Sequence, residues 1–502
     1  MSITTLRDIV DYSASAYGTA TAYRYKEKKQ LIDKSFLDVK KDSMAISRMV
    51  KDLGLEEKHI ALLGPTSYSW IVSFFGITSS KSVAVPLDVQ LPGEALCELL
   101  DRADVEMLIF DELRRDVYEM AAKKCPKLRY FVSMQQKEHE EKVLSWEKEV
   151  EAYQGEYETK PQEKDLCTIL FTSGTTGKSK GVMLTHENLT QNAMSIGLKL
   201  EPGTVSMTVL PINHVYCLTM DIIKGLELGI CCCINDSIMR VAKNMKLFQP
   251  EIILLVPLVI ESIYAKLKGA GELLPKKLIA KQAFGGNLKL ICSGGAYLNP
   301  DYIEKFKEYG ITILQGYGMT ECAPVISTNL LEDNRKGSVG KLIANCEGKV
   351  VEEEIWVRGS SVMKGYYKMP EETAQTLEDG WLKTGDLGYI DEDNYVYITG
   401  RKKNLIILAN GENVSPEEIE NEISKADLVK EIVVREAEGK IQAEIFPDFE
   451  YAKKKRIKEL ESALQEIIDK YNSTAPVYKR VLDLKLREVE FEKNTSRKIK
   501  RT

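Results

Sequence analysis

The stretch that decides how this chain folds runs from Thr168 to Leu189 and reads TILFTSGTTGKSKGVMLTHENL. Its apolar start, Thr168–Phe171, predicts a strand, and the ten residues that follow (172–181) are all glycine, lysine or hydroxyl-bearing. Glycines let backbone N–H groups approach an anion closely, hydroxyls add donors, and lysines add positive charge. The segment therefore predicts a loop that binds a polyphosphate.

Three other interpretations of this segment are weaker. A Walker A loop, G-x-x-x-x-G-K-[S/T], fits at Gly177-Lys178-Ser179, but its required first glycine falls on Thr172. The dinucleotide fingerprint G-x-G-x-x-G fails in its spacing. A flexible surface loop is the third alternative, and the apolar strand directly before the loop argues against it.

Composition indicates a globular protein of several domains and excludes some partners. The 502 residues suggest about three domains, or two if one is large, and 69 Lys and Arg against 75 Asp and Glu give a formal charge of −6. This balance argues against a protein that coats nucleic acid, because such binding depends on neutralising phosphates. Four widely separated histidines argue against a His-rich metal centre.

Cysteine usage and apolar runs indicate the compartment. The ten cysteines include no C-x-x-C pair, and Cys231–Cys233 fit a buried strand. A disulfide framework is not expected in a chain this long, which favours a reducing compartment. The first residues lack the pattern of a signal peptide, and the longest apolar run, Ile252–Ile260, is about half of what spans a bilayer. We therefore expect a cytoplasmic protein with no membrane span.

Short apolar runs alternate with amphipathic stretches up to about Lys349, which predicts parallel sheets covered by helices on both faces. From there to Thr399, short segments joined by Gly, Asp and Asn turns predict a β-rich subdomain. The expected strands are Ile60–Leu63, Ser82–Val85, Met107–Phe110, Ser206–Leu210, Glu251–Leu255, Lys289–Ser293, Thr312–Gln315, Ile355–Arg358, Leu387–Ile390 and Tyr395–Ile398, with early helices at Ser69–Thr78 and Gly93–Arg102.

A separate unit of about 100 residues is expected after Gly400. Its first helix begins at Ser415-Pro416-Glu417-Glu418, where Ser415 and Glu418 fit a capping box and the proline suits the first turn. A hairpin over Glu431–Arg435 and Gln442–Phe446 and a helix over Ala452–Lys470 follow. The fold class is therefore expected to be α/β, with a large domain at residues 1–400 and a small α+β domain at residues 401–502.

The phosphate loop resembles the signature loop of the adenylate-forming superfamily, which comprises acyl- and aryl-CoA synthetases, luciferases and peptide-synthetase adenylation domains. Other motifs of this superfamily occur in the same order along the chain. They are LPINHVY (210–216), LICSGGA (290–296), QGYGMTE (315–321), GWLKTGD (380–386), TGRKK (399–403) and FEKNTSRKIKR (491–501). The resemblance implies a large domain of stacked α/β sheets with the β-rich subdomain, and a small domain that is mobile.

The resemblance also implies roles for single residues. His214 and Tyr216 would border the acyl pocket, and the glycines flanking Tyr317 would permit a tight turn that presents its ring to a purine. Glu321 would bind Mg²⁺ beside Thr320, and Lys403 would be the hinge. The implied catalytic residues are Lys498, Thr320 and Glu321, although Arg497 replaces the usual glycine. The implied nucleotide-binding residues are Thr172, Ser173, Gly174, Thr175, Thr176, Gly177, Lys180, Gly294, Gly295, Ala296, Gln315, Gly316, Tyr317, Thr320, Asp386, Arg401 and Lys498.

The implied activity is ATP-dependent activation of a carboxylic acid as an acyl-adenylate, followed by thioester formation with coenzyme A. The motifs fit fatty acyl-CoA ligases best, and ATP, Mg²⁺ and coenzyme A are the implied cofactors and acceptor. Fatty acyl-AMP ligases carry an insertion beyond residues 340–355, and no extra block is evident here, which favours thioester formation. No carrier domain follows Thr502, so the acceptor is expected in trans.

Several alternatives stay open. A separate acyl carrier protein would replace coenzyme A as the acceptor, or an aryl acid would replace the fatty acid. A non-catalytic acyl-binding homologue is disfavoured because Thr175, Glu321, Asp386, Arg401 and Lys498 are all present. A luciferase is disfavoured only because it is rarer. Lys500 and Arg501 are interpreted as an ordinary basic tail.

Overall fold

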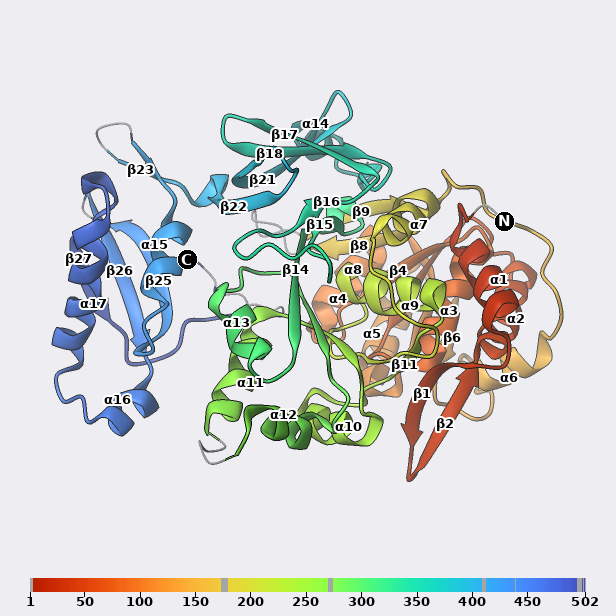
Figure 1. Cartoon of the computed structure of the whole chain (residues 1–502). Helices are drawn as coiled ribbons and strands as arrows, with labels where there is room; N and C mark the ends of the chain where they lie inside the picture. The colour runs from red at the N-terminus through yellow and green to blue at the C-terminus, as the bar shows by residue number, and fades with distance from the viewer. Residues whose placement is uncertain are drawn as a thin grey trace. The chain divides into compact units, whose positions relative to one another are not determined.

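The chain forms two units of unequal size (Figure 1). The first comprises residues 1–295, 302–347 and 357–382, and the second comprises residues 296–301, 348–356 and 383–502. The computed structural model describes residues 3–172, 179–269, 274–408, 412–437, 439–493, 499 and 501. The predicted glycine-rich loop residues Ser173, Gly174, Thr175, Thr176 and Gly177, and the predicted catalytic Lys498, lie outside the described residues.

An eight-stranded sheet in the first unit contains the strand before the phosphate loop. Its order is β19-β9-β8-β4-β3-β5-β6-β7. The strands from β8 to β7 in this order run parallel, and β9 runs antiparallel to both of its neighbours. The bounds are β3 His59–Leu63, β4 Val83–Leu87, β5 Val105–Phe110, β6 Tyr130–Ser133, β7 Leu144–Ser145, β8 Leu166–Thr172, β9 Lys180–Thr185 and β19 Gly365–Tyr366.

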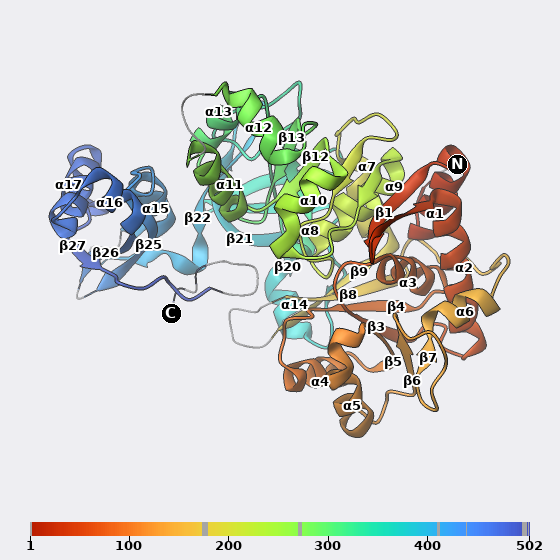
Figure 2. The ribbon, with the colours of Figure 1, turned by 90° about the horizontal axis from the view of Figure 1, so that it is seen from below.

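Helices cover both faces of this sheet, as the alternation predicted (Figure 2). α4 (Gly93–Arg102) and α5 (Arg115–Lys124) bury Leu96, Leu100 and Val117 in one apolar cluster with residues of β3, β4 and β5. α3 (Tyr68–Ser79) lies on the other face and is buried at every residue except Ser69, which suits a helix that is apolar on nearly every side. The predicted strands and helices of this region are confirmed.

A nine-stranded sheet forms the second layer of the first unit, in the order β16-β15-β14-β13-β12-β10-β11-β1-β2. Its middle strands are parallel, and β2, β15 and β16 are antiparallel additions at the edges. The three consecutive cysteines form β11 and are buried, as predicted. The bounds are β1 Thr21–Glu27, β2 Gln30–Ser35, β10 Val205–Met207, β11 Cys231–Cys233, β12 Ile252–Leu255, β13 Leu290–Ser293, β14 Thr312–Gly318, β15 Val325–Thr328 and β16 Lys341–Leu342.

The remaining helices of this part pack on the two sheets. Close packing of α2 on α3 depends on Gly76, where a Cβ atom would lie 2.5 Å from the Cβ of Ile46. None of the helices in the described ranges is long and apolar enough to cross a bilayer. The bounds are α1 Leu6–Tyr17, α2 Phe36–Asp52, α6 Trp146–Ala152, α7 His186–Ser195, α8 Val215–Cys217, a π-helical segment Leu218–Ile223, α9 Lys224–Leu228, α10 Val241–Phe248, α11 Pro257–Gly269, α12 Lys276–Phe284, α13 Asp301–Lys307 and α14 Pro370–Thr376.

The second unit ends in a small α+β core. β25 pairs antiparallel with β26 as the predicted hairpin, β27 adds in parallel, and α15 and α17 bury Ile419, Ile423, Leu464 and Ile468 against the sheet. Strands β17, β18 and β21 each run from one unit into the other. The bounds are β17 Cys346–Val351, β18 Glu354–Gly359, β20 Leu377–Glu378, β21 Trp381–Ile390, β22 Val396–Arg401, β23 Ile406–Ile407, β24 Asn413–Val414, α15 Pro416–Ile423, β25 Val429–Ala437, β26 Lys440–Pro447, α16 Phe449–Lys455, α17 Leu460–Thr474 and β27 Asp483–Leu486.

Two local predictions in the second unit are wrong. The Ser415 side chain does not cap α15, because its hydroxyl instead donates to the Thr399 carbonyl at 2.9 Å. The single helix predicted over Ala452–Lys470 is two helices, because Arg456 takes a left-handed conformation and its N–H closes the end of α16. Ile457, just beyond this turn, packs against the core, which is the apolar contact that often accompanies such an ending.

Candidate active site

Three of the predicted segments follow strands in the middle of the nine-stranded sheet. Residues 214–216 come after β10, residues 294–295 after β13, and residues 320–321 after β14. These strands, with β12 between β10 and β13, are parallel neighbours. Because the carboxyl ends of parallel strands meet at one edge, the three segments lie at the same edge of the sheet, where open α/β sheets bind ligands.

The predicted acyl-pocket residue Tyr216 contacts the predicted adenine-binding turn. Its Oη donates to the carbonyl of Cys292 at 3.3 Å. A Cβ atom at Gly294 would lie 3.0 Å from Cζ of Tyr216, so the glycine makes room for the ring. His214 directly precedes α8 and is half-buried. Ala296, the last residue of this motif, belongs to the second unit.

The tight turn predicted around Tyr317 is absent, because Gln315–Gly318 are the extended end of β14. Gly318 is required for a different reason. A Cβ atom at Gly318 would lie 2.0 Å from the carbonyl oxygen of Pro324, so only glycine permits this approach of two backbone segments. A short 3₁₀ turn, Thr320–Cys322, then presents Glu321.

Glu321 is held by two bonds from one segment of chain. Tyr366 of β19 donates its hydroxyl to Oε1 of Glu321 at 2.8 Å. The backbone N–H of Met363 donates to the Glu321 carbonyl at 2.9 Å. Asn192 of α7 fixes the other side of the turn, because its Nδ2 donates to the Cys322 carbonyl at 3.1 Å. Both the backbone and the carboxylate of Glu321 are therefore positioned.

The ends of the phosphate loop are closed by a strand pair. Thr172 of β8 stands opposite Lys180 of β9 in an antiparallel register. Arg102 of α4 donates to the Ser179 carbonyl at 2.8 Å. The Lys180 ammonium lies 4.7 Å from the centre of the Tyr366 ring, a cation–π contact. One tyrosine thus contacts both the end of the phosphate loop and the carboxylate of Glu321.

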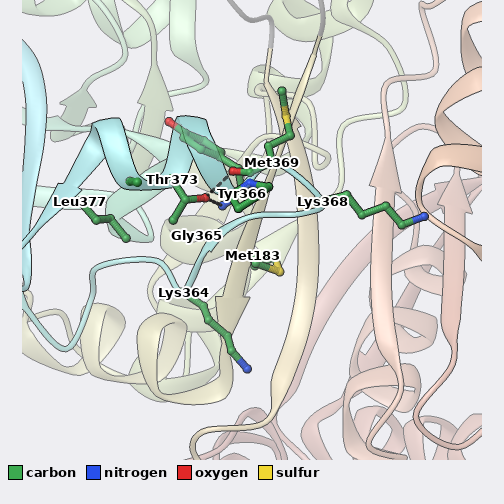
Figure 3. A pocket seen from close by; sticks show the side chains of 10 residues that line it. Met183, Lys364, Gly365, Tyr366, Lys368, Met369, Thr373 and Leu377 are labelled. Atoms are coloured by element: carbon green, nitrogen blue, oxygen red, sulfur yellow. Dashed lines mark hydrogen bonds between the residues drawn. The ribbon is translucent and has the colours of Figure 1, made fainter.

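A cavity of about 460 Å³ lies beside Tyr366, between β9, β19 and α14. Figure 3 shows the Thr373 hydroxyl facing the backbone of Tyr366, to which it is bonded at 2.9 Å, while the ends of Lys364 and Lys368 point away. The cavity borders the Tyr366 segment without adding a charged group directed into it.

The donor set at Glu321 fits a magnesium ion that is shared with phosphates. No group of three or more His, Cys, Asp and Glu side chains in the described ranges could hold a metal ion, so protein ligands alone do not make a site there. Mg²⁺ is commonly held by one or two carboxylates together with substrate phosphates and water. Glu321 is partly exposed and supplies one such carboxylate.

In the second unit, two predicted nucleotide-binding residues are paired with each other. Arg401 Nε lies 2.7 Å from Oδ1 of Asp386. In the same way Lys402 Nζ lies 2.9 Å from Glu354, which also accepts the Gly385 N–H. The predicted hinge, Lys403, is exposed, and partial desolvation together with the nearby Arg401 cation lowers the pKa of its ammonium.

The chain on either side of the predicted catalytic lysine is anchored. Ile499 packs beside Phe446 and Phe491, and it forms an isolated β-bridge with Lys493. Arg501 is ion-paired with Glu420 of α15. The interpretation of Arg501 as part of an ordinary basic tail is therefore wrong. Burial raises the pKa of Glu420 to about 7, and the Arg501 guanidinium opposes that shift.

Two family models match most of this chain. The AMP-binding enzyme family matches residues 10–367, and its C-terminal domain family, the AMP-binding enzyme C-terminal domain, matches residues 403–502. The chain belongs to the AMP-binding enzyme family. This confirms the resemblance to the adenylate-forming superfamily and the α/β fold class with a large N-terminal and a smaller C-terminal domain.

Curated relatives of this AMP-binding enzyme include two bacterial long-chain-fatty-acid–CoA ligases. The one from Salmonella typhimurium is 29% identical over 429 residues, which cover 76% of this chain and 74% of the relative. The one from Bacillus subtilis is 28% identical over 496 residues, which cover 90% and 86%.

Solved structures share the fold over nearly the whole chain. An anthranilate CoA ligase in complex with anthranoyl-AMP gives a TM-score of 0.86 at 22% identity, covering 99% of this chain and 96% of that one. A fatty acyl CoA synthetase from Mycobacterium tuberculosis gives 0.73 at 21% identity, with the same coverages. At these identities the likeness concerns the fold.

Two residues of the site lie outside the sequence motifs. Tyr366 belongs to a short apolar strand far along the chain from both Lys180 and Glu321, and Arg102 ends a helix in the first quarter of the chain. Neither carries a local pattern that indicates phosphate or metal chemistry. Their contacts with the site arise from the pairing of β19 with β9 and from the position of α4.

Proposed function

We propose that this AMP-binding enzyme is an AMP-forming acid–thiol ligase that activates a carboxylic acid with ATP and transfers the acyl group to coenzyme A. The observation that carries the proposal is the contact of Tyr366 with both Lys180 and Glu321. This contact brings the phosphate loop, a feature suited to a polyphosphate, next to a carboxylate suited to Mg²⁺.

The first reaction joins the carboxylate oxygen of the acid to the α-phosphorus of ATP and breaks the bond to the β-phosphate, so pyrophosphate leaves. The loop from Thr172 to Lys180 would hold the β- and γ-phosphates through backbone N–H groups, hydroxyls and the lysine charge. When bound, Mg²⁺ supplies positive charge that neutralises the phosphates. Glu321 and Thr320 would orient that charge, and fixed charge of this kind is the main contribution of proteins to phosphoryl transfer.

The second reaction forms a bond between the thiol sulfur and the acyl carbon, and AMP leaves with the electrons of the broken C–O bond. Lys498 would stabilise charge on the acid and the bridging oxygen in the first step, with Asp386 and Arg401 at the ribose. A small domain at residues 401–502, turning at Lys403 against residues 1–400, would then move Lys498 away. Lys403→Pro is therefore expected to spare adenylate formation and impair thioester formation.

A fatty acid is the substrate that the two long-chain-fatty-acid–CoA ligase relatives favour. Tyr216 and His214 would border the acyl group, since Tyr216 packs against the turn at Gly294. Ten free, buried cysteines support a reducing, cytoplasmic location. An aryl acid, or a separate acyl carrier protein as the acceptor, would be alternative outcomes of the same assay.

The test measures pyrophosphate release from ATP with fatty acids of graded length and with aryl acids, and then AMP release on adding coenzyme A or a phosphopantetheinylated carrier protein. We expect release with long fatty acids and acceptor-dependent turnover with coenzyme A. Glu321→Gln should lower the first rate by about 10²- to 10³-fold. Absence of any adenylate across the whole panel would overturn the proposal and favour a non-catalytic acyl-binding protein.

A further inference from the structure

The hydroxyl of Tyr366 donates to one oxygen of the carboxylate of Glu321, the predicted magnesium ligand. Tyr366 is only 5% exposed, whereas Glu321 is partly exposed. The bond joins Tyr366 Oη to Glu321 Oε1 at 2.8 Å and leaves Oε2 of the glutamate outside this bond. No lysine or arginine forms an ion pair with Glu321 in the described part of the chain.

We propose that Tyr366 is a positioning residue that fixes the Glu321 carboxylate for a divalent cation at Oε2. The inference rests on the proposed function, in which Glu321 is the magnesium ligand. A phenol suits this task because it orients the carboxylate without adding positive charge that would compete with the metal. Hydrogen-bonding partners behind a ligating carboxylate hold it in place and raise metal affinity.

The surroundings hold Tyr366 in place. Its side chain is buried, its N–H donates to Thr373 Oγ1 at 2.9 Å, and Tyr366 pairs with Val182 of β9. Lys180 rests over the ring face and not on the carboxylate.

The neighbouring residue provides a matched control. Tyr367 donates its hydroxyl to Oδ2 of Asp104 at 2.5 Å, so it too bonds a carboxylate. Asp104 is already paired with Lys127 and Lys368, and these contacts keep the pKa of its carboxyl low despite partial burial. Tyr366→Phe and Tyr367→Phe thus each remove one hydroxyl bonded to a carboxylate, but only Tyr366→Phe affects the proposed metal ligand.

The experiment compares both variants with the wild-type protein at varied free Mg²⁺. The readouts are acid-dependent pyrophosphate release and the binding of Mn²⁺ with a non-hydrolysable ATP analogue, followed by electron paramagnetic resonance. For Tyr366→Phe we expect the half-saturating metal concentration to rise about tenfold or more in both readouts. The KM for the acid should be unchanged, and Tyr367→Phe should stay within about twofold of wild type.

Two further measurements make the result decisive. Combining Tyr366→Phe with Glu321→Gln should add nothing to the metal requirement of Glu321→Gln alone, because residues acting through one group are not additive. If Tyr366→Phe does not fold, hydrogen exchange of residues 363–367 in the wild-type protein is measured in its place. This exchange should become slower when Mn²⁺ and the ATP analogue are added together, but not when the analogue is added with EDTA. Unchanged metal affinity in Tyr366→Phe, an equal shift in Tyr367→Phe, or unchanged exchange would overturn the positioning role. Absence of adenylate formation in the wild type would instead overturn the proposed function.

Discussion

Arg401 and Asp386 face each other across the antiparallel pair of β21 and β22, with Nε of the arginine 2.7 Å from Oδ1 of the aspartate. The aspartate side chain is 3% exposed and the arginine 43%. The carboxylate is therefore enclosed, and Arg401 already compensates its charge. Both residues were predicted to bind the nucleotide, and in the structure they are paired with each other.

The pair predicts that Arg401→Met weakens both nucleotide binding and the fold. Loss of the partner of an enclosed carboxylate should lower the free energy of unfolding by about 1–3 kcal/mol and raise the KM for ATP. Lys402→Met is the control. Lys402 directly follows Arg401 and pairs with Glu354, a carboxylate about as enclosed as that of Asp386. Denaturant unfolding and ATP titrations separate the effects. Equal KM values for ATP in the two variants would remove Arg401 from the nucleotide site.

Gly294→Ala should disturb the acid site through Tyr216. The new Cβ would lie 3.0 Å from Cζ and 3.2 Å from Oη of Tyr216, so the ring has to move. We expect a higher KM for the carboxylic acid and a destabilisation of about 1–3 kcal/mol from overpacking. Tyr216→Leu in the same chain should restore stability. If the KM values of Gly294→Ala for the acid and for ATP are unchanged, the turn at Gly294 does not belong to the site.

Asp221→Asn should change how stability depends on pH. Asp221 is buried in the π-helical segment, and neither of its carboxylate oxygens has a hydrogen-bond partner among the described residues. Burial raises the pKa of Asp221 to about 8, an effect that the neighbouring Cys217 thiol opposes only in part. In the unfolded chain the pKa of an aspartate is about 3.9.

The direction in which stability changes with pH follows from the number of protons bound in the folded and unfolded chains. Between about pH 4 and about pH 8 the folded chain holds one proton more at this site than the unfolded chain, so the free energy of unfolding falls as pH rises. Asp221→Asn removes this contribution and should make the protein more stable than wild type near pH 8. Denaturant unfolding at several pH values measures it, and an identical slope in wild type and variant would contradict the assignment.

Arg501→Met should slow adenylate formation through the position of Lys498. Ile499 and Arg501 anchor the chain just beyond the predicted catalytic lysine, and the ion pair of Arg501 with Glu420 is one of these anchors. Misplacement of a catalytic group by about 1 Å costs up to about 10²-fold in rate. Lys425→Met, which breaks an exposed pair with Glu422, is the control. A rate equal to that of Lys425→Met would show that this anchor is dispensable.

The local predictions succeeded where the signal lies in consecutive residues. The strand before the phosphate loop, the buried strand of three cysteines and the hairpin after Val429 follow from apolar patterning over a few residues. The predictions failed where a distant partner competes for a group. Ser415 has the residue type of a helix cap, but its hydroxyl proton goes to the Thr399 carbonyl, which no local pattern reveals.

The sequence by itself determined the family, the α/β fold class and the chemical types gathered in each motif, because these depend on short patterns and their order. Tertiary structure alone decided that the Tyr366 hydroxyl donates to Glu321 while Lys180 lies over the Tyr366 ring. It also decided that Tyr216 packs against Gly294 and that Arg501 forms an ion pair with Glu420. Each of these contacts joins residues that lie far apart along the chain. Their meeting depends on strand order and loop paths, which local patterning of side chains does not encode.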